Sequence, residues 1–425
     1  MAHMLFVTQY YPPEVGADQT HLGETAARLV ELGHQVTVLT TLPNYPLGIV
    51  PKEYRDKSRR HEVRDGVRVI RVWSHIAPNR GFLPRILAQL SFGSLGGILG
   101  IKDVGQPDIV IAVSPPLFTA IAGRFIAWRK RCPLLFHVAD IWPEAAIQLG
   151  TLRNRALIWC AEWLERSTYQ RAAAIWTVTE GCRHTLMDRE VPADRIFVVR
   201  IGADTRVLRP LPKAQARAEL GWEDGFVLLY VGTVGLAQGL ETVLDAAEAL
   251  RNHSDIRIVI VGEGSARAEL IAEANRRALT NVAFLGQQPH DRIPLLIAGA
   301  DVCLVPLRKL PLFEGTLPVK MYEAMAAERA IILAADGESR QLAEQEAGAA
   351  IGVEPENPAA LAQAIMHLHD RPALTQQLGR NGRAFIEAYL DREKLAADVA
   401  RHAEEILCRS ARTSAGTANL SQQPL

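Results

Sequence analysis

The chain has 425 residues, of which 48% are hydrophobic and 22% charged, and its 47 basic and 47 acidic residues leave no formal net charge. This length suggests two domains, with three as the alternative, and the neutral balance gives no support to nucleic-acid binding. The five cysteines include no Cys-x-x-Cys pair and no signal-peptide pattern opens the sequence, so we expect reduced thiols, no zinc site and a cytoplasmic protein.

In the first half, short β-branched runs alternate with helical patterns. Buried runs separated by helices predict a parallel sheet covered on both faces. We therefore predict a doubly wound, Rossmann-like α/β domain over residues 1–202. Its strands are expected at 4–8, 35–40, 67–72, 108–113, 134–139, 174–179 and 196–201, with helices such as 21–33 and 116–131 between them.

Two stretches of this domain carry candidate chemistry. The long segment after the first strand holds Gly16, where a ligand can approach the backbone closely. His137, Asp140 and Glu144 lie at and just beyond the end of a predicted strand, where they could orient or deprotonate a hydroxyl nucleophile. A core histidine and a helix-capping aspartate are the structural alternative.

Residues 82–101 are strongly apolar and rich in glycine. Their uncharged part is about 16 residues long, shorter than the roughly 20 that cross a bilayer, so we expect no transmembrane helix. A buried helix and a peripheral contact with the cytoplasmic face of the membrane both remain open. Arg80 and Arg85 favour the second.

The second half repeats the α/β pattern after a polar, proline-bearing stretch that we interpret as a linker, residues 203–224. A second Rossmann-like domain is predicted over 225–390, followed by a helix at 391–411 that could pack back on the first domain and a tail without regular structure at 412–425. Its strands are expected at 226–232, 257–262, 282–286, 302–307 and 330–335, with helices such as 241–252 and 266–278.

Three strand ends of this second domain lead into loops that suit a phosphorylated ligand. The first loop holds Gly232 and Gly235, and the second places Glu263 after Gly262. Glycines let backbone N–H groups approach a phosphate, although a plain tight turn is the alternative for each loop.

The third loop is FEGTLPVKMYEAMA, residues 313–326. Pro318 suits the first position of a helix, and Lys320 and Glu323 are three residues apart, so they share a face of its first turn. A loop, a helix start and a lysine together favour an anion, and the glutamate can accept hydrogen bonds from hydroxyls. The stretch therefore suits a phosphorylated sugar or a ribose. A surface Lys–Glu pair on an amphipathic helix is the alternative.

Motifs along the chain to about residue 400 resemble family 4, or group 1, retaining glycosyltransferases with the GT-B fold. The combination also resembles a bacterial branch of that family that builds cell-surface polysaccharides. The motifs are YYPPEVGADQTHLGETAARLVELGHQVTVLT near the start, SPPLFTA at 114–120, DIWPEAAIQLG at 140–150, GTVGLAQGLETVLDAA at 232–247, VGEG at 261–264 and LPVKMYEAMA at 317–326.

The resemblance implies two Rossmann-like domains facing across a cleft. A UDP-sugar or GDP-sugar donor would bind the second domain. A hydroxyl acceptor, such as a lipid-linked glycan at the cytoplasmic membrane face, would bind the first.

The resemblance also implies roles on the donor side. Glu323 matches the second glutamate of the family's Glu-x7-Glu motif, which binds the donor ribose. The first glutamate falls on Gly315, with Glu314 beside it, and the intervening Thr316, Leu317 and Pro318 would line the same site.

The family's diphosphate-binding Arg/Lys pair is missing, and Gln238 stands where the lysine would be. We therefore expect Lys320 and backbone N–H groups to hold the phosphates, with help from Arg308 or Lys309.

On the acceptor side, His137 matches a residue that is often histidine in the family, with Asp140 and Glu144 as alternatives. In retaining members the departing diphosphate helps to deprotonate the acceptor, and no metal is needed. The sequence contains no Asp-x-Asp motif, which agrees with a metal-independent enzyme. A UDP-sugar epimerase of the same architecture and a degenerate, non-catalytic transferase are the alternatives.

Overall fold

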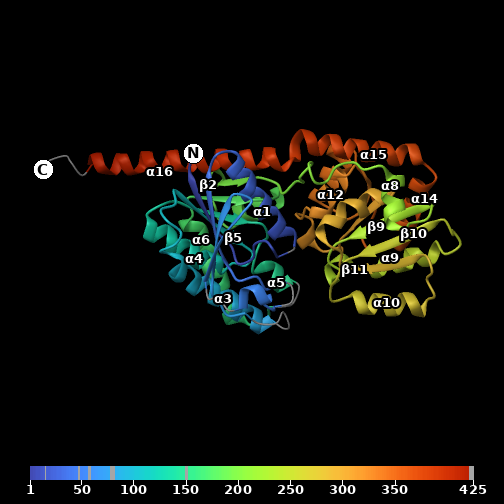
Figure 1. The fold of residues 1–425 in the computed structure, drawn as a ribbon, viewed down its shortest axis with the longest axis horizontal. Helices are drawn as coiled ribbons and strands as arrows, with labels where there is room; N and C mark the ends of the chain where they lie inside the picture. The colour runs from blue at the N-terminus through green and yellow to red at the C-terminus, as the bar shows by residue number, and fades with distance from the viewer. Residues whose placement is uncertain (15, 46–47, 56–58, 77–81, 149–151, 421–425) are drawn as a thin grey trace. The chain divides into compact units, whose positions relative to one another are not determined.

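The computed structural model describes residues 1–14, 16–45, 48–55, 59–76, 82–148 and 152–420. The chain forms two compact units, Met1–Arg200 with Glu393–Leu425, and Ile201–Arg392. Each unit is a sheet with helices packed on its faces (Figure 1). All the predicted strands are present, and the predicted pair of Rossmann-like domains is confirmed.

The N-terminal unit is built on an eight-stranded sheet with the order β3-β4-β2-β1-β5-β6-β7-β8, in which only the β3–β4 pair is antiparallel. The strands are β1 His3–Val7, β2 Gln35–Thr41, β3 Arg59–Arg64, β4 Val67–Val72, β5 Ile109–Ser114, β6 Leu134–Val138, β7 Ala174–Thr177 and β8 Ile196–Val198. The helices are α1 Ala17–Glu31, α2 Lys52–Arg55, α3 Phe82–Gly100, α4 Thr119–Lys130, α5 Glu144–Gln148, α6 Arg155–Arg171, α7 Glu180–Asp188 and, from Glu393 on, α16 Arg392–Leu420.

Strand β3 was not among the predicted elements. It lies at the edge of the sheet and is mostly polar, so it lacks the apolar run by which the other strands were recognised. Asp65 and Gly66, both at positive φ (50° and 77°), form the tight turn that joins it to β4. An Asp-Gly pair between two strands is a common signal of a β-hairpin, so this pair could have predicted the hairpin from the sequence.

Helix α3 is glycine-rich because it packs closely on α4. A Cβ added at Gly93 would lie 2.3 Å from the carbonyl oxygen of Phe118, and one at Gly97 would lie 3.2 Å from Cα of Ala122. Larger residues at these two positions would force the helices apart. The packing of α3 on α4 therefore explains Gly93 and Gly97.

Both interpretations of residues 82–101 find a counterpart in α3. Its inner face is buried, with Phe92 fully so, whereas Leu87, Leu95 and Ile98 are exposed. In the described part of the chain, no helix combines the length and the apolar character needed to cross a membrane.

The C-terminal unit has a six-stranded parallel sheet with the order β11-β10-β9-β12-β13-β14. The strands are β9 Phe226–Val231, β10 Ile256–Val261, β11 Val282–Gly286, β12 Val302–Pro306, β13 Ala330–Ala334 and the short β14 Ala350–Gly352. The helices are α8 Lys213–Leu220, α9 Glu241–Ala249, α10 Arg267–Arg276, α11 Ile293–Gly299, α12 Val319–Ala326, α13 Glu338–Arg340, α14 Pro358–His369 and α15 Pro372–Phe385.

Two predicted boundaries differ from the structure. The expected linker, 203–224, belongs to the C-terminal unit and contains helix α8, whose Arg217 is buried and bonded to Asp301. The structure continues helix α16 through Leu420, where a tail without regular structure was expected from 412. Within the N-terminal unit, His402 of this helix stacks on Phe197 of β8, with 4.1 Å between the ring centroids.

The connections fix where ligands can bind. In the N-terminal sheet the chain leaves β1 toward β2 on one side and β5 toward β6 on the other. In the C-terminal sheet the same reversal falls between β9 and β12. Loops diverge beyond the strand ends at such switch points, and ligands of open α/β sheets bind there. The predicted site residues follow these same strand ends or lie in the next loops along the edge.

Candidate functional site

The switch point of the C-terminal sheet begins with two glycine loops packed against each other. Gly232 and Gly262 have φ values of 146° and 138°, which L side chains rarely adopt. A Cβ on Gly262 would lie 1.8 Å from the carbonyl oxygen of Gly232. The N–H of Val234 donates to the carbonyl of Glu263 at 2.9 Å, so the two loops are joined as one backbone surface.

Lys320 of α12 lies directly against this surface. Its Nζ donates to the hydroxyl of Tyr230 at 2.9 Å and lies 4.3 Å from the centroid of the tyrosine ring. A Cβ on Gly232 would lie 3.1 Å from the same Nζ, so a larger residue there would crowd the ammonium. Burial lowers the pKa of Lys320 to about 8, although nearby Glu323 opposes the shift. A phosphate group would supply the close negative charge that this ammonium lacks.

Glu323 lies one turn further along the same helix. Burial raises the pKa of this carboxyl group, and Lys320 opposes that shift. The residue as a whole is only partly buried. Helix α12 begins at Val319, and Pro318 is its N-cap, one position before the place predicted for it.

Hydrogen bonds to backbone carbonyl groups organise the loop before α12. The carbonyl of Glu314 accepts the N–H of Glu338 at 2.7 Å, while its side chain is exposed. The hydroxyl of Thr316 donates to the carbonyl of Leu312 at 3.4 Å, and Leu317 is buried. Gly315 stays partly exposed between them. This segment therefore holds the start of α12 in place.

The other cations expected to help with phosphates are held by carboxylates of the protein. Arg308 donates to Glu356 at 2.8 Å and to Glu241 at 2.9 Å, and Lys309 donates to Glu354 at 2.9 Å. Lys320 differs from both of them, because its hydrogen-bond partner is the neutral hydroxyl of Tyr230.

Gln238 and Glu263 also have partners within the protein. The Gln238 side chain accepts the N–H of Gly235 at 3.2 Å, which closes the first glycine loop on itself. Glu263 is exposed and lies 3.5 Å from Arg267 in an ion pair. Both side chains are therefore bonded within the C-terminal unit.

At the N-terminal sheet, the long segment after β1 is organised by Glu14, which the sequence analysis did not single out. Its buried carboxylate accepts backbone N–H groups of Tyr11 at 3.0 Å and of Asn44 and Tyr45 at 2.8 Å each. Gly16 precedes α1 as its N-cap, and a Cβ there would lie 2.2 Å from Oε1 of Gln19.

His137 lies in the core of the N-terminal unit. It is 1% exposed, its ring stacks on Trp176 at 3.8 Å, and its Nδ1 lies 3.2 Å from the Trp176 carbonyl oxygen. Burial lowers the pKa of His137 to about 4. This is the placement of a core histidine, the structural alternative for His137.

Asp140 is the predicted acceptor-side residue that the structure leaves open to solvent. Although its side chain is accessible, the surrounding protein raises the pKa of Asp140 to about 6, and the carboxylate of Asp18 adds to the shift. Asp18, at the start of α1, is likewise accessible and has a raised pKa for the same reason. Two carboxylates from different segments therefore lie near each other at this edge.

Glu144 is separated from this pair by its own ion pair. It bonds to Arg189 of the segment after α7, and the same guanidinium bonds to the buried Glu165. The structure thus places the three predicted residues of this edge in three different environments.

Two residues of the site were missed because no local pattern marks them. Tyr230 is an inward-facing strand residue, indistinguishable in sequence from its apolar neighbours. Asp18 resembles an ordinary acidic residue of a first helical turn. In the described residues, no group of three or more His, Cys, Asp or Glu side chains is placed to hold a metal ion.

Comparison with known families gives a match in each unit. Residues 16–202 match the glycosyl transferase 4-like domain, and residues 212–385 match the family described as glycosyl transferases group 1. Together the two matches span most of the chain.

Relatives of known name support the same assignment. The chain is 27% identical to the putative colanic acid biosynthesis glycosyl transferase WcaI of Escherichia coli K12, over 91% of this chain and 95% of that protein. It is also 27% identical to D-inositol 3-phosphate glycosyltransferase 1 of Catenulispora acidiphila, over 85% and 84%.

Solved structures share the fold. The sucrose-phosphate synthase of Thermosynechococcus elongatus aligns with a TM-score of 0.74 at 19% identity, over 96% of this chain and all of that one. Anabaena HepE in complex with UDP-glucose aligns with a TM-score of 0.70 at 17% identity, over 95% of this chain and all of that one. These likenesses confirm the predicted GT-B fold class.

Proposed function

We propose that the chain moves a sugar from a nucleotide-diphosphate donor to a hydroxyl acceptor with retention of configuration, because its two units match the glycosyl transferase 4-like domain and the glycosyl transferases group 1. One observation carries the donor half of this proposal. Lys320 is held against the glycine loops with its pKa lowered to about 8, and Glu323 lies one turn away, all at the switch point of the C-terminal sheet. That arrangement suits a diphosphate next to a ribose.

In the proposed reaction, Lys320 stabilises the leaving diphosphate. The bond between the anomeric carbon and the β-phosphate oxygen breaks, and negative charge grows on that oxygen. The Lys320 ammonium is fixed against Tyr230 before the reaction, so it stabilises this charge without reorganising. Glu323 accepts hydrogen bonds from the ribose hydroxyls and sets the position of the donor.

Asp140 orients the acceptor hydroxyl. The acceptor oxygen bonds to the anomeric carbon on the face that the diphosphate leaves, and its proton passes to a phosphate oxygen. A carboxylate with a pKa of about 6 is ionised at neutral pH and can accept a hydrogen bond from the incoming hydroxyl. None of these steps calls on a metal, and we propose a metal-independent enzyme.

We further propose a hexose or N-acetylhexosamine as the sugar, carried on UDP or GDP, and a lipid-linked glycan of a cell-surface polysaccharide as the acceptor. HepE, with the same fold, is solved with UDP-glucose, which supports a UDP-sugar. The name of the WcaI relative supports a polysaccharide pathway. The exposed Leu87, Leu95 and Ile98 of α3 support a peripheral contact with the cytoplasmic membrane face.

The test is calorimetric titration of UDP and of GDP in the presence of a metal chelator. We expect one nucleotide to bind, Glu323→Ala to weaken it, and affinity to fall as pH rises through about 8 because Lys320 loses its charge. Binding of neither nucleotide would contradict the donor site. Binding without pH dependence in this range would remove Lys320 from the phosphate contact.

Product analysis separates the alternatives. The donor matching the bound base is incubated with and without a glycan acceptor, and the anomeric configuration of the product is read by NMR. Epimerised donor formed without acceptor would favour the epimerase, and binding without turnover would favour a non-catalytic transferase.

A further inference from the structure

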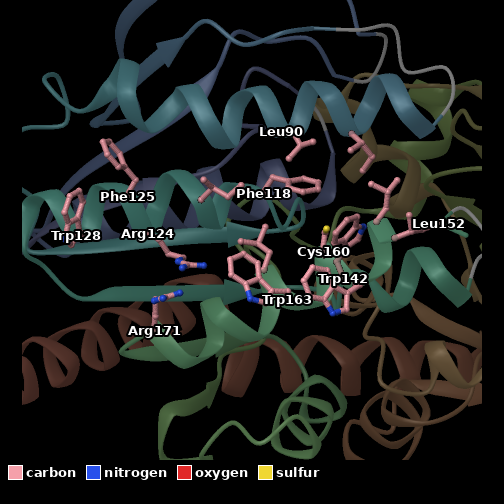
Figure 2. A pocket seen from close by; sticks show the side chains of 16 residues that line it. Leu90, Phe118, Arg124, Phe125, Trp128, Trp142, Leu152, Cys160, Trp163 and Arg171 are labelled. Atoms are coloured by element: carbon pink, nitrogen blue, oxygen red, sulfur yellow. The ribbon is translucent and has the colours of Figure 1, made fainter. Parts of the chain in front are cut away.

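An apolar cavity of the N-terminal unit lies between helices α3, α4 and α6. Its volume is about 970 Å³, within the usual range for ligand pockets. Its lining is almost entirely apolar and includes four of the chain's seven tryptophans, at 128, 142, 159 and 163. We call this cavity the tryptophan groove (Figure 2).

Three of these tryptophans are exposed to an unusual degree. Trp128 is 71%, Trp159 65% and Trp163 57% accessible. Large aromatic side chains gathered at one exposed site mark an interaction surface more often than a random surface feature. Tryptophan is also the residue enriched where protein meets the interface of a membrane.

Two arginines supply the charge. Arg124 of α4 and Arg171 at the end of α6 line the groove together, and Figure 2 shows their guanidinium groups turned toward each other. Arg124 donates only to the neutral hydroxyls of Ser167 at 2.8 Å and Thr168 at 3.3 Å. In the described residues, neither arginine forms an ion pair with a carboxylate. Arg171 is exposed and Arg124 is partly buried, so an anion from solution or from a membrane surface can reach both guanidinium groups.

The carboxylates of the region are kept out of the groove. Helices α3 and α4 contain no Asp or Glu at all. The acidic residues of α6, Glu162 and Glu165, line a different cavity and are paired with Arg166 and Arg189. The groove is therefore apolar and positive in a chain whose overall charge is zero.

We propose that the tryptophan groove binds an anionic phospholipid of a membrane surface, with the lipid phosphate between Arg124 and Arg171 and an acyl chain along the tryptophans. The arginines lie at the opposite end of the groove from Trp142, which follows Asp140 by two residues (Figure 2). A lipid head group held there could not present a sugar to Asp140. The site therefore suits a lipid of the bilayer and not the acceptor's own lipid. The inference gives chemical detail to the proposed membrane contact, and it does not depend on the donor or on catalysis.

The test is flotation with vesicles of phosphatidylcholine alone and of phosphatidylcholine mixed with phosphatidylglycerol. We expect the protein to bind the mixed vesicles, and Arg124→Gln with Arg171→Gln to weaken that binding about thirtyfold, since each basic residue near an anionic surface contributes about fivefold. The matched control removes the same charge elsewhere, with Arg166→Gln and Arg183→Gln, two ion-paired surface arginines. Thermal unfolding of both double variants checks that they fold.

A second measurement places the lipid chain. Brominated phosphatidylglycerol should quench the fluorescence of the wild type, and Trp159→Phe with Trp163→Phe should reduce that quenching, since Trp128 and Trp142 are then the groove's remaining tryptophans. Equal weakening by the two arginine pairs, equal binding to neutral vesicles, or no binding would each overturn the proposal. Self-association that the tryptophan variant abolishes, without vesicle binding, would assign the groove to a second copy of the chain. Because vesicle binding needs neither donor nor turnover, its failure leaves the proposed transferase function standing, and a failed UDP titration leaves this site standing.

Discussion

The sheet edge of each unit carries candidate site residues, and the two edges are assembled differently. At the C-terminal unit, one helix start brings Lys320 and Glu323 together, and the lysine touches both Tyr230 and the loop at Gly232. At the N-terminal unit, the predicted residues lie apart: His137 is in the core, Glu144 is in an ion pair, and Asp140 alone is open.

The difference shows which kind of site a sequence reveals. Residues three or four apart on a helix share a face whatever the rest of the fold does, so the pattern 320/323 had a structural meaning before the fold was known. Residues around a strand end need not share a face in this way. Consecutive residues of a strand point to opposite faces of the sheet, and a residue in the helix that follows can instead contact a side chain of another segment. The variants below test whether the two edges also differ in function.

The largest effect is expected from Lys320→Met. Removing a fixed positive charge from the leaving diphosphate should lower kcat/KM about 10²–10³-fold. The matched control is Lys309→Met, since that lysine is exposed and its pair with Glu354 contributes little. Steady-state kinetics with the donor identified by titration measures both. Similar losses in the two variants would mean that general electrostatics, and not the site at α12, governs the donor.

Asp140→Asn should lower kcat about 10²-fold while leaving nucleotide affinity unchanged. Because the carboxylate is the active form, wild-type activity should fall as pH drops below about 6, and the variant should lose this limb of the profile. Asp18→Asn removes the neighbouring charge that raises the Asp140 pKa, so it should move the limb to lower pH. If the acidic limb of the pH profile is unchanged in Asp18→Asn, the charge of Asp18 does not affect the pKa of Asp140.

Much of the fold could be predicted because the strands of a parallel sheet are continuous apolar runs. The elements that were not predicted are polar or short. Strand β3 has a polar surface at a sheet edge, and β14 has three residues. Helix α8 looked like a linker because its apolar content is low, yet Arg217 fixes it to the unit by bonds to Asp301 and the carbonyl of Gly299.

The sequence predicted only those site residues that lie close together along the chain. Lys320 was identified, but its partner Tyr230 lies 90 residues away on another strand. Arg308 and Lys309 were expected to be available, and their charges are taken by Glu241, Glu356 and Glu354 from other segments. Long-range ion pairs of this kind depend on the tertiary fold, and no spacing rule reports them.

His137→Asn tests the core assignment through the pH dependence of stability. The pKa of His137 is lowered to about 4 in the folded state, so the unfolded state binds more protons between pH 4 and 6.5. Its contribution to stability is present above pH 6.5 and is lost as pH falls toward 4. The wild type should therefore lose about 2 kcal/mol more than the variant between pH 7 and 4.5. Urea unfolding measures this difference. If stability depends on pH in the same way in the wild type and the variant, and the variant has lost turnover, His137 acts at the acceptor site and not in the core.

The smallest effect is expected from Glu144→Gln, four residues from Asp140. Its bond to Arg189 is partly exposed, and surface ion pairs of this kind contribute about 0–1 kcal/mol. Arg189 keeps its second bond, to the buried Glu165, so the segment after α7 stays anchored. We expect activity within about twofold of the wild type and a barely lower free energy of unfolding. Glu165→Gln is the matched variant. It removes the buried side of the same guanidinium contact and should destabilise the protein by about 3 kcal/mol, again without a specific loss of turnover. A hundredfold loss of kcat in Glu144→Gln at unchanged stability would contradict the structural role given to this residue. It would also make the two edges of the site alike, each with two charged groups acting on a substrate.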